Sequence, residues 1–412
     1  MAAPLYNDNC YHEHASPPYS ASVTDGERIL ELQPSQFTPS TNLPEQHLFR
    51  SPMIKLDLGT RIWPFSAPCF GYKGVIEGKV FVTTLEHVKR LIITAEATIK
   101  SLIMERGPGG HVESDLFKRS VILYTNNPRS PGVNLSFPFS ISLPAFCDKS
   151  SNPLPPSFEC RLPGNCTEIQ YRIRVDMSRS GLRRRERRVI LVVPILYLPR
   201  SNLSPTPWST QSSSDQFRVS STVQAMAELH LAPRSTPLPS KVDKSKLPPS
   251  ADVQAKIALP SPLVVASGDR IPFVITIRSQ SQALAALYTD IELQLVKVII
   301  VKVNQNSSHR KAAVLAYGEV YESEEPGNGV RVLRGELGSG VPGAELSWSA
   351  KGIIEVRHAI RFALKPLPGG DALSANLPIF ERMIQLEVMT HRYTPDMDAT
   401  APALGLMGLN II

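Results

Sequence analysis

The stretch QYRIRVDM, residues 170–177, alternates between apolar and polar side chains at every position. Successive side chains of a β-strand point to opposite faces, so the two kinds of side chain separate onto the two faces of a strand. The apolar face holds Tyr171, Ile173, Val175 and Met177, and the polar face holds Gln170, Arg172, Arg174 and Asp176. This pattern predicts an antiparallel strand with one face in a core and the other in water.

The same period of two recurs along most of the chain. It is clear in RLIITAEATIK (90–100), RIPFVITIR (270–278), GIIEVRHAIRFAL (352–364) and MIQLEV (383–388), and strand-like runs also lie at 53–63, 74–84, 117–124, 137–143 and 189–197. The run YTDIELQLVKVIIVKV (288–303) becomes apolar on both faces after Leu295, which predicts a strand that is central or bulged. The 37 prolines in 412 residues also disfavour long helices, because proline removes a backbone donor and clashes within a helical turn. We therefore expect an all-β protein built as two tandem antiparallel immunoglobulin-like β-sandwiches.

Composition divides the chain into five parts. Residues 1–45 are rich in Pro and Ser and are expected to be a disordered tail, and residues 200–251 read as a Ser/Thr/Pro-rich linker with an edge strand or short helix around 216–232. The predicted sandwiches are residues 46–199 and 252–395, followed by a short C-terminal tail at 396–412.

Charge and cysteine content favour an intracellular protein without a cofactor. The formal net charge of +7 permits attraction to acidic partners but does not by itself indicate nucleic-acid binding, so we expect no nucleic acid partner. The five cysteines are an odd number without metal-type spacing, which indicates reduced thiols in the cytoplasm. The first residues lack the basic-then-apolar pattern of a signal peptide. We predict no metal site, no cofactor and no catalytic residues, and hence no enzyme.

Several motifs in a fixed order resemble the arrestin-like proteins, particularly the fungal α-arrestin type. The motifs MIKLDLGTRIW, CFGYKGVIEGKVFV, FPFSISLP, LPPSFE, IQYRIRV and PILYLPRS, spread over residues 53–201, are similar to the arrestin N-terminal domain. SGDRIPFVITIRS (267–279) is similar to the opening of the arrestin C-terminal domain. The resemblance covers residues 50–200 well and 252–393 more loosely, and it implies the arrestin fold and a role as an adaptor for membrane-protein cargo in endocytosis and protein transport.

The resemblance also implies PPxY sequences that recruit WW-domain-containing HECT ubiquitin ligases. No strict PPxY is present: SPPYS at residues 16–20 has serine in place of the first proline, and a second P-x-Y lies at residues 4–6. WW domains bind proline-rich segments because the polyproline II conformation is already formed before docking. The candidate ligand residues are Pro4, Tyr6, Pro17, Pro18 and Tyr19. The alternative is a polar tail in which these residues have no partner.

A second candidate site is the stretch RSGLRRRERR, residues 179–188, between two predicted strands. Its arginines are Arg179, Arg183, Arg184, Arg185, Arg187 and Arg188. As a hairpin tip they would pair with phosphate or carboxylate groups on a cargo tail or with anionic lipid at the plasma membrane or endosomes. The alternative, equally consistent with the sequence, is a solvated turn whose charge discourages edge pairing.

Two other functions compete with a ligase adaptor. One is a cargo-sorting scaffold of the same fold that binds no ligase, closer to the retromer-related arrestin relatives. The other is a β-sandwich hydrolase or carbohydrate-binding protein, against which the missing catalytic motif and the cysteine content weigh.

Overall fold

The structure is a computed structural model of the chain. It describes residues 43–103, 110–126, 135–148, 150–180, 186–201, 226–234, 253–302, 308–366, 377–392, 394 and 396–410. The fold presented below is that of the compact unit Pro44–Ile412.

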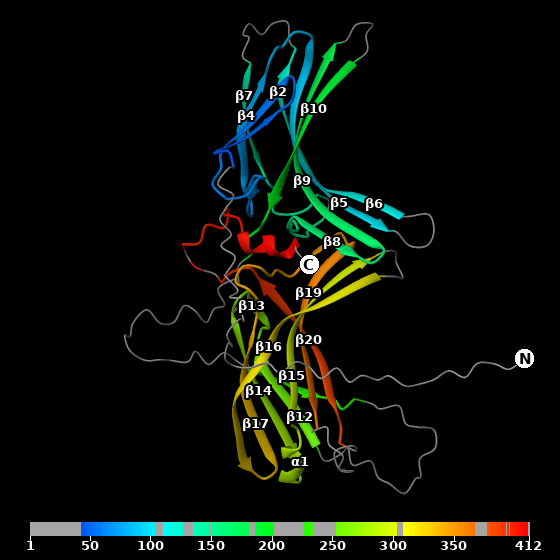
Figure 1. The fold of residues 1–412 in the computed structure, drawn as a ribbon, viewed down its shortest axis with the longest axis vertical. Helices are drawn as coiled ribbons and strands as arrows, with labels where there is room; N and C mark the ends of the chain where they lie inside the picture. The colour runs from blue at the N-terminus through cyan, green and yellow to red at the C-terminus, as the bar shows by residue number, and fades with distance from the viewer. Residues whose placement is uncertain are drawn as a thin grey trace, which may run out of the picture. The chain divides into compact units, whose positions relative to one another are not determined.

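Two sheets face each other in the first half of this unit (Figure 1). The four-stranded sheet has the order β1 (Gln46–Arg50), β2 (Ile54–Thr60), β4 (Val75–Val82) and β7 (Ser136–Ser142). The six-stranded sheet has the order β3 (Cys69–Phe70), β10 (Glu186–Tyr197), β9 (Asn165–Ser180), β5 (Val88–Ile103) and β6 (Gly110–Thr125), and β8 (Phe158–Leu162) pairs with β9 outside this order. All of these pairings are antiparallel except that of β10 with the two-residue β3.

The apolar and polar side chains that alternate over residues 170–177 lie on the inner and outer faces of β9. Tyr171, Ile173, Val175 and Met177 are at most 2% exposed, whereas the polar residues between them are half-buried. Their core also contains Leu56, Ile76 and Val80 from the four-stranded sheet. The prediction of an antiparallel sandwich strand is confirmed at this site.

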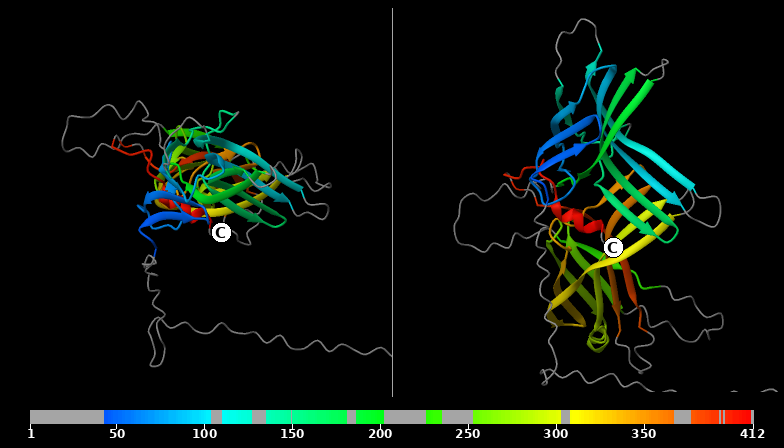
Figure 2. Two further views of the ribbon diagram at one scale, coloured as in Figure 1. Left: turned by 90° about the horizontal axis from the view of Figure 1, so that it is seen from above. Right: turned by 45° about the horizontal axis from the view of Figure 1, so that its top comes forward.

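The second half is a single sheet that curls around its own core. Its strands are β11 (Met226–Leu231), β12 (Val253–Pro260), β14 (Arg270–Ser279), β17 (Val330–Gly338), β16 (Ser308–Gly327), β15 (Asp290–Lys302), β19 (Ile354–Lys365), β20 (Phe380–Met389) and β13 (Val264–Ala266), in that order, with β18 (Trp348–Ala350) paired to β19. The core joins Phe273 of β14 to Phe362 of β19 and Phe380 of β20, although these strands lie far apart in the sheet order. One sheet can supply all of these residues only if its two ends curl toward each other (Figure 2). The prediction of an all-β sandwich fold is confirmed. In the second half, one curled sheet supplies both layers.

Strand β15 shows why its sequence is apolar on both faces. It lies between β16 and β19, so it is central in the sheet, and its pairing with β16 shifts register between Leu295 and Val296. The strand is therefore both central and bulged. Its far end also leaves the curled sheet's own core, because Val301 belongs to the core of the first half.

Contacts between the two halves combine apolar packing with hydrogen bonds. The rings of Phe158 in β8 and Trp348 in β18 meet edge to face with centroids 5.1 Å apart. Ser201 and Thr390 exchange three hydrogen bonds, in which the Ser201 backbone N–H donates to Thr390 Oγ1 at 2.9 Å. The ring contact joins β8 to β18, and the hydrogen bonds join the segment after β10 to the residue that follows β20.

Helix contributes little to the described residues. A five-residue helix, α1 (Gln282–Ala286), precedes β15, and a 3-10 helix, η5 (Leu404–Asn410), packs Leu406 against Leu198 and Leu346. Within the described ranges no helix has both the length and the apolar character needed to cross a membrane. The predicted boundaries between tail, sandwiches and linker stay predictions.

Candidate functional site

The outer face of the six-stranded sheet gathers arginine and aliphatic side chains in adjacent rows. Residues directly opposite one another on neighbouring strands share a face of the sheet. One row is Arg90 of β5, Ser178 of β9 and Arg188 of β10, the next is Ile122 of β6, Ile92, Asp176 and Ile190, and the third is Thr94, Arg174 and Val192. We call Arg90, Ile92, Ile122, Arg174, Asp176, Arg188, Ile190 and Val192 the arginine–isoleucine face.

Three of the four aliphatic members of this face are open to solvent, and Ile92 is half-buried. Ile122 is 55% exposed, and Ile190 and Val192 are each 49% exposed. Single exposed aliphatic residues are ordinary on protein surfaces, but adjacent ones with a polar rim are typical of protein-binding sites. Beside them Arg90, Arg174 and Arg188 line a shallow cavity of about 220 Å³ with Asp176 as its acidic member.

The arginines of the face differ in their partners. Arg174 Nε donates to Asp176 Oδ2 at 2.7 Å, so its charge is largely compensated. The side chains of Arg90 and Arg188 are exposed, and neither side chain forms a hydrogen bond or ion pair with a residue in the part of the chain that the structure describes. They lie two strands apart in one row, a separation of about 10 Å at the usual strand spacing. Two such cations would attract a partner that carries carboxylate or phosphate groups.

The predicted basic hairpin is placed in part. Arg187 and Arg188 are exposed on β10, and Arg187 lies opposite Arg179 in the register. Arg179 has a structural role, since Nη2 donates to the Glu86 carbonyl at 3.0 Å and Nη1 contacts Met53 Sδ at 3.2 Å. Arg183, Arg184 and Arg185 lie outside the described residues. The pairing of β10, β9 and β5 thus places Arg188 in one row with Arg90, a residue that no feature of the sequence links to the hairpin.

The predicted WW-domain ligands, Pro4, Tyr6, Pro17, Pro18 and Tyr19, all lie outside the described residues. Docking of a ligase to this segment stays a prediction.

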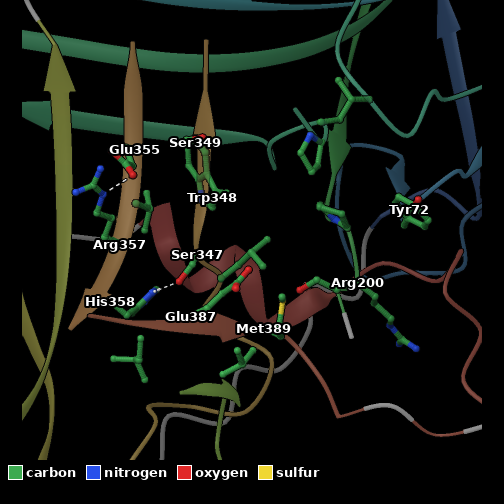
Figure 3. A pocket seen from close by; sticks show the side chains of 18 of the residues that line it. Tyr72, Arg200, Ser347, Trp348, Ser349, Glu355, Arg357, His358, Glu387 and Met389 are labelled. Atoms are coloured by element: carbon green, nitrogen blue, oxygen red, sulfur yellow. Dashed lines mark hydrogen bonds and ion pairs between the residues drawn. The ribbon is translucent and has the colours of Figure 1, made fainter. Parts of the chain in front are cut away.

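A larger cavity of about 890 Å³ lies where the two halves meet. Tyr72, Leu154 and Tyr197 come from the first half, and Trp348 and Met389 come from the curled sheet. Figure 3 shows Ser349, Trp348 and Glu355 on one side of the cavity and Tyr72 and Arg200 on the other. The sequence could not indicate this cavity, because its walls are brought together only by the contact between the halves.

A chain of buried polar groups ends at the cavity wall. Lys297 Nζ lies 3.2 Å from Glu345 Oε2, and the same oxygen is 3.1 Å from His358 Nε2. The other ring nitrogen, Nδ1, is 2.9 Å from Ser347 Oγ, and that oxygen also accepts the backbone N–H of Val388 at 2.9 Å. Both ring nitrogens of the fully buried His358 are therefore occupied, as Figure 3 shows for Ser347.

This arrangement explains the burial of Lys297 and His358. A buried ammonium needs a counter-charge, and Glu345 supplies one while also accepting from His358. Lys297, Glu345 and His358 were not singled out from the sequence. The available signal was Lys297, which lies after Leu295 where the strand is apolar on both faces. A lysine buried there needs a carboxylate nearby.

The described residues contain no group of three or more His, Cys, Asp or Glu side chains placed to hold a metal ion. The described cysteines, Cys69, Cys147, Cys160 and Cys166, form no disulfide with one another.

The sequence matches no known protein-family model and no curated protein.

Proposed function

We propose that this protein is an intracellular adaptor of the arrestin-like type that links membrane-protein cargo to a ubiquitin ligase or to sorting machinery. The proposal is supported by the motif resemblance and by the all-β sandwich architecture. The observation that carries it is the arginine–isoleucine face, where exposed aliphatic side chains lie beside Arg90 and Arg188.

Such a face suits an extended acidic segment of a cargo protein. Aliphatic side chains of the segment would cover Ile122, Ile190 and Val192 and remove apolar surface from water. Its carboxylate or phosphate groups would pair with Arg90 and Arg188, which raises the association rate most at low salt. Binding of this kind requires neither a cofactor nor a reacting group.

A charge-reversal experiment tests this face. The variant Arg90→Glu/Arg188→Glu should lose binding to acidic cytoplasmic tails of membrane proteins, measured by titration with the purified full chain. Arg50→Glu, an exposed arginine on β1 of the other sheet, is the control, and it should retain binding. Equal binding by the two variants at low salt would exclude this face as the cargo site.

The ligase part of the proposal depends on the N-terminal segment. Removal of residues 1–25, or the double change Tyr6→Ala/Tyr19→Ala, should reduce co-purification of a HECT ligase from cells. Two weak P-x-Y sites on one segment can act together through effective concentration, so the double change should exceed either single change.

The second candidate is the ligase-independent sorting scaffold, favoured by the absence of a strict PPxY from the sequence. Proximity labelling in the native cell distinguishes the two candidates. A ligase among the labelled neighbours, lost on removal of residues 1–25, supports the ligase adaptor. Sorting proteins and cargo without a ligase support the scaffold.

A further inference from the structure

One long edge of the six-stranded sheet has no partner strand. On one side, β10 pairs with β9 over residues 186–195, but on its other side only Leu196 and Tyr197 pair, with the two-residue β3. Figure 1 shows β10 at the margin of the first half. Within the described part of the chain, the edge of β10 beside residues 186–195 is therefore open.

The hydrogen bonds near the end of β10 show which backbone groups face this open edge. The N–H of Leu196 donates to the Pro68 carbonyl at 2.9 Å, on the side of β3 and away from β9. The backbone groups of alternate strand residues point to opposite edges, and the register of β10 with β9 is unbroken over residues 186–195. Ile190 and Val192 have the same parity as Leu196, so their N–H groups also point to the open edge, and neither bonds to a described residue there.

The opposite edge of the same sheet is partly covered. In β6 the Leu116 carbonyl accepts the Asp148 N–H at 2.7 Å, and the Lys118 N–H donates to Asp148 Oδ2 at 3.1 Å. An open edge is a template on which another extended chain can pair. The edge of β10, which lacks a cover of this kind among the described residues, is the side of this sheet that can accept a further strand.

The side chains of β10 indicate what kind of segment would fit. Val189 and Leu191 are half-buried and pack against the sandwich core, so an added strand would cover their exposed parts. Arg187 and Arg188 are exposed at the start of the strand. A second copy of this chain would bring the same cations to the edge, whereas an acidic segment would neutralise them. Charge therefore favours an acidic partner over self-association.

We infer that the open edge of β10 binds an extended acidic segment of a partner protein as an added β-strand. The segment would exchange backbone hydrogen bonds with Ile190 and Val192 and place its carboxylates beside Arg188. In strand addition, backbone hydrogen bonds supply affinity and alternate side chains supply specificity. The inference rests on the proposed cargo-binding function, and it specifies that the cargo segment is held by its backbone as well as by its side chains.

The first test uses the purified wild-type full chain and a fluorescein-labelled peptide, Glu-Glu-Val-Thr-Val-Thr-Val-Glu-Glu, followed by fluorescence anisotropy at low salt. The peptide is acidic at both ends, so it fits in either direction. The matched peptide with lysine in place of every glutamate should bind at least about tenfold more weakly.

Backbone methylation of the peptide separates strand addition from side-chain contact. One peptide carries N-methyl groups on its three valines and another on its two threonines, and only one of these two sets can face β10. One N-methylated peptide should therefore bind at least about tenfold more weakly than the parent, and the other within about threefold of it. Equal binding by the two N-methylated peptides, or no saturable binding by the parent, overturns the inference.

The second test changes the protein at the edge itself. Val192→Pro removes an N–H that points away from β9, so the ladder with β9 stays intact, as it does at the native Pro194 of the same parity. Val192→Thr, which keeps the N–H and the branched shape, is the matched control. Val192→Pro should bind the acidic peptide at least about fivefold more weakly than Val192→Thr.

The outcomes distinguish this inference from the proposed function. If Val192→Pro binds the peptide as Val192→Thr does, strand addition is wrong, but cargo binding stands as long as Arg90→Glu/Arg188→Glu loses the cargo tails. A wild-type dimer in sedimentation analysis that Val192→Pro dissociates would assign the edge to a second copy of this chain and would also overturn the inference.

Discussion

Replacing Glu345 by glutamine tests whether the buried ion pair between Lys297 and Glu345 stabilises the folded protein. The change keeps the shape of the side chain and removes its charge. Lys297, whose side chain is 2% exposed, would then be buried without a counter-ion. Breaking a buried ion pair from one side typically destabilises a protein by about 3–5 kcal/mol. For an unfolding unit of about 150–250 residues, the size of the half that contains the curled sheet, that free energy corresponds to a fall in melting temperature of about 10 °C.

A surface pair at the same separation provides the control. Lys256 Nζ and Glu228 Oε2 are also 3.2 Å apart, but their side chains are 35% and 62% exposed. Glu228→Gln should therefore lower the unfolding free energy by about 1 kcal/mol at most. Distance is constant across the two pairs, so the difference between the two variants measures the effect of burial.

The double variant Lys297→Met/Glu345→Gln completes the comparison. It removes the stranded ammonium, and replacing a buried ion pair by neutral groups is often close to neutral in stability. We expect it to regain most of the stability that Glu345→Gln loses, measured by thermal unfolding followed by circular dichroism. The reasoning is refuted if Glu345→Gln melts within about 1 °C of Glu228→Gln, or if the double variant is less stable than Glu345→Gln.

Three further predictions concern other parts of the structure. Burial raises the pKa of the Cys69 thiol to about 12, so iodoacetamide at pH 8 should modify Cys69 far more slowly in the folded protein than in urea, as followed by mass spectrometry. The Arg119 guanidinium, which bonds to both carboxylate oxygens of Asp148, lowers the pKa of that carboxyl. The pair's contribution to stability is present above the unfolded-state pKa and is lost as the pH falls through the folded-state pKa. Asp148→Asn should therefore be up to about 1 kcal/mol less stable than the wild type at pH 7 and equally stable in acid. A Cβ on Gly71 would lie 2.3 Å from the Thr400 carbonyl oxygen, so Gly71→Ala should expose the segment around Thr400 to limited proteolysis, whereas Gly338→Ala, whose nearest neighbour would be 3.5 Å away, should not.

The sequence predicted those features that depend on local alternation. The inner and outer residues of β9 follow from the order of side chains along one strand, and the doubly apolar run of β15 follows from its central position. Each inference needs only the strand's own residues and the period of two. The arginines flanking residues 181–185 were found from a local run of charge between two predicted strands.

Features that depend on distant pairing could not be predicted. Arg90 joins Arg188 only through the register of three strands, and Glu345 meets Lys297 from a segment between β17 and β18. Alternation reports which face a side chain occupies, but it carries no information on which strand lies beside it. The cavity is harder still to predict from the sequence, because it depends on how the curled sheet packs against the first sandwich.

The two candidate sites place opposite demands on stability, and this difference allows their functions to be separated. The exposed side chains of the arginine–isoleucine face, such as Ile122, Ile190 and Arg188, can be replaced with a change in partner binding and little effect on unfolding. The cavity lining belongs to the contact between the halves, where Trp348 packs on Phe158, so replacements there should lower the stability of the folded protein. Substitutions at the two places should therefore separate in two measurements, because those on the arginine–isoleucine face change partner binding and those in the cavity lining change unfolding.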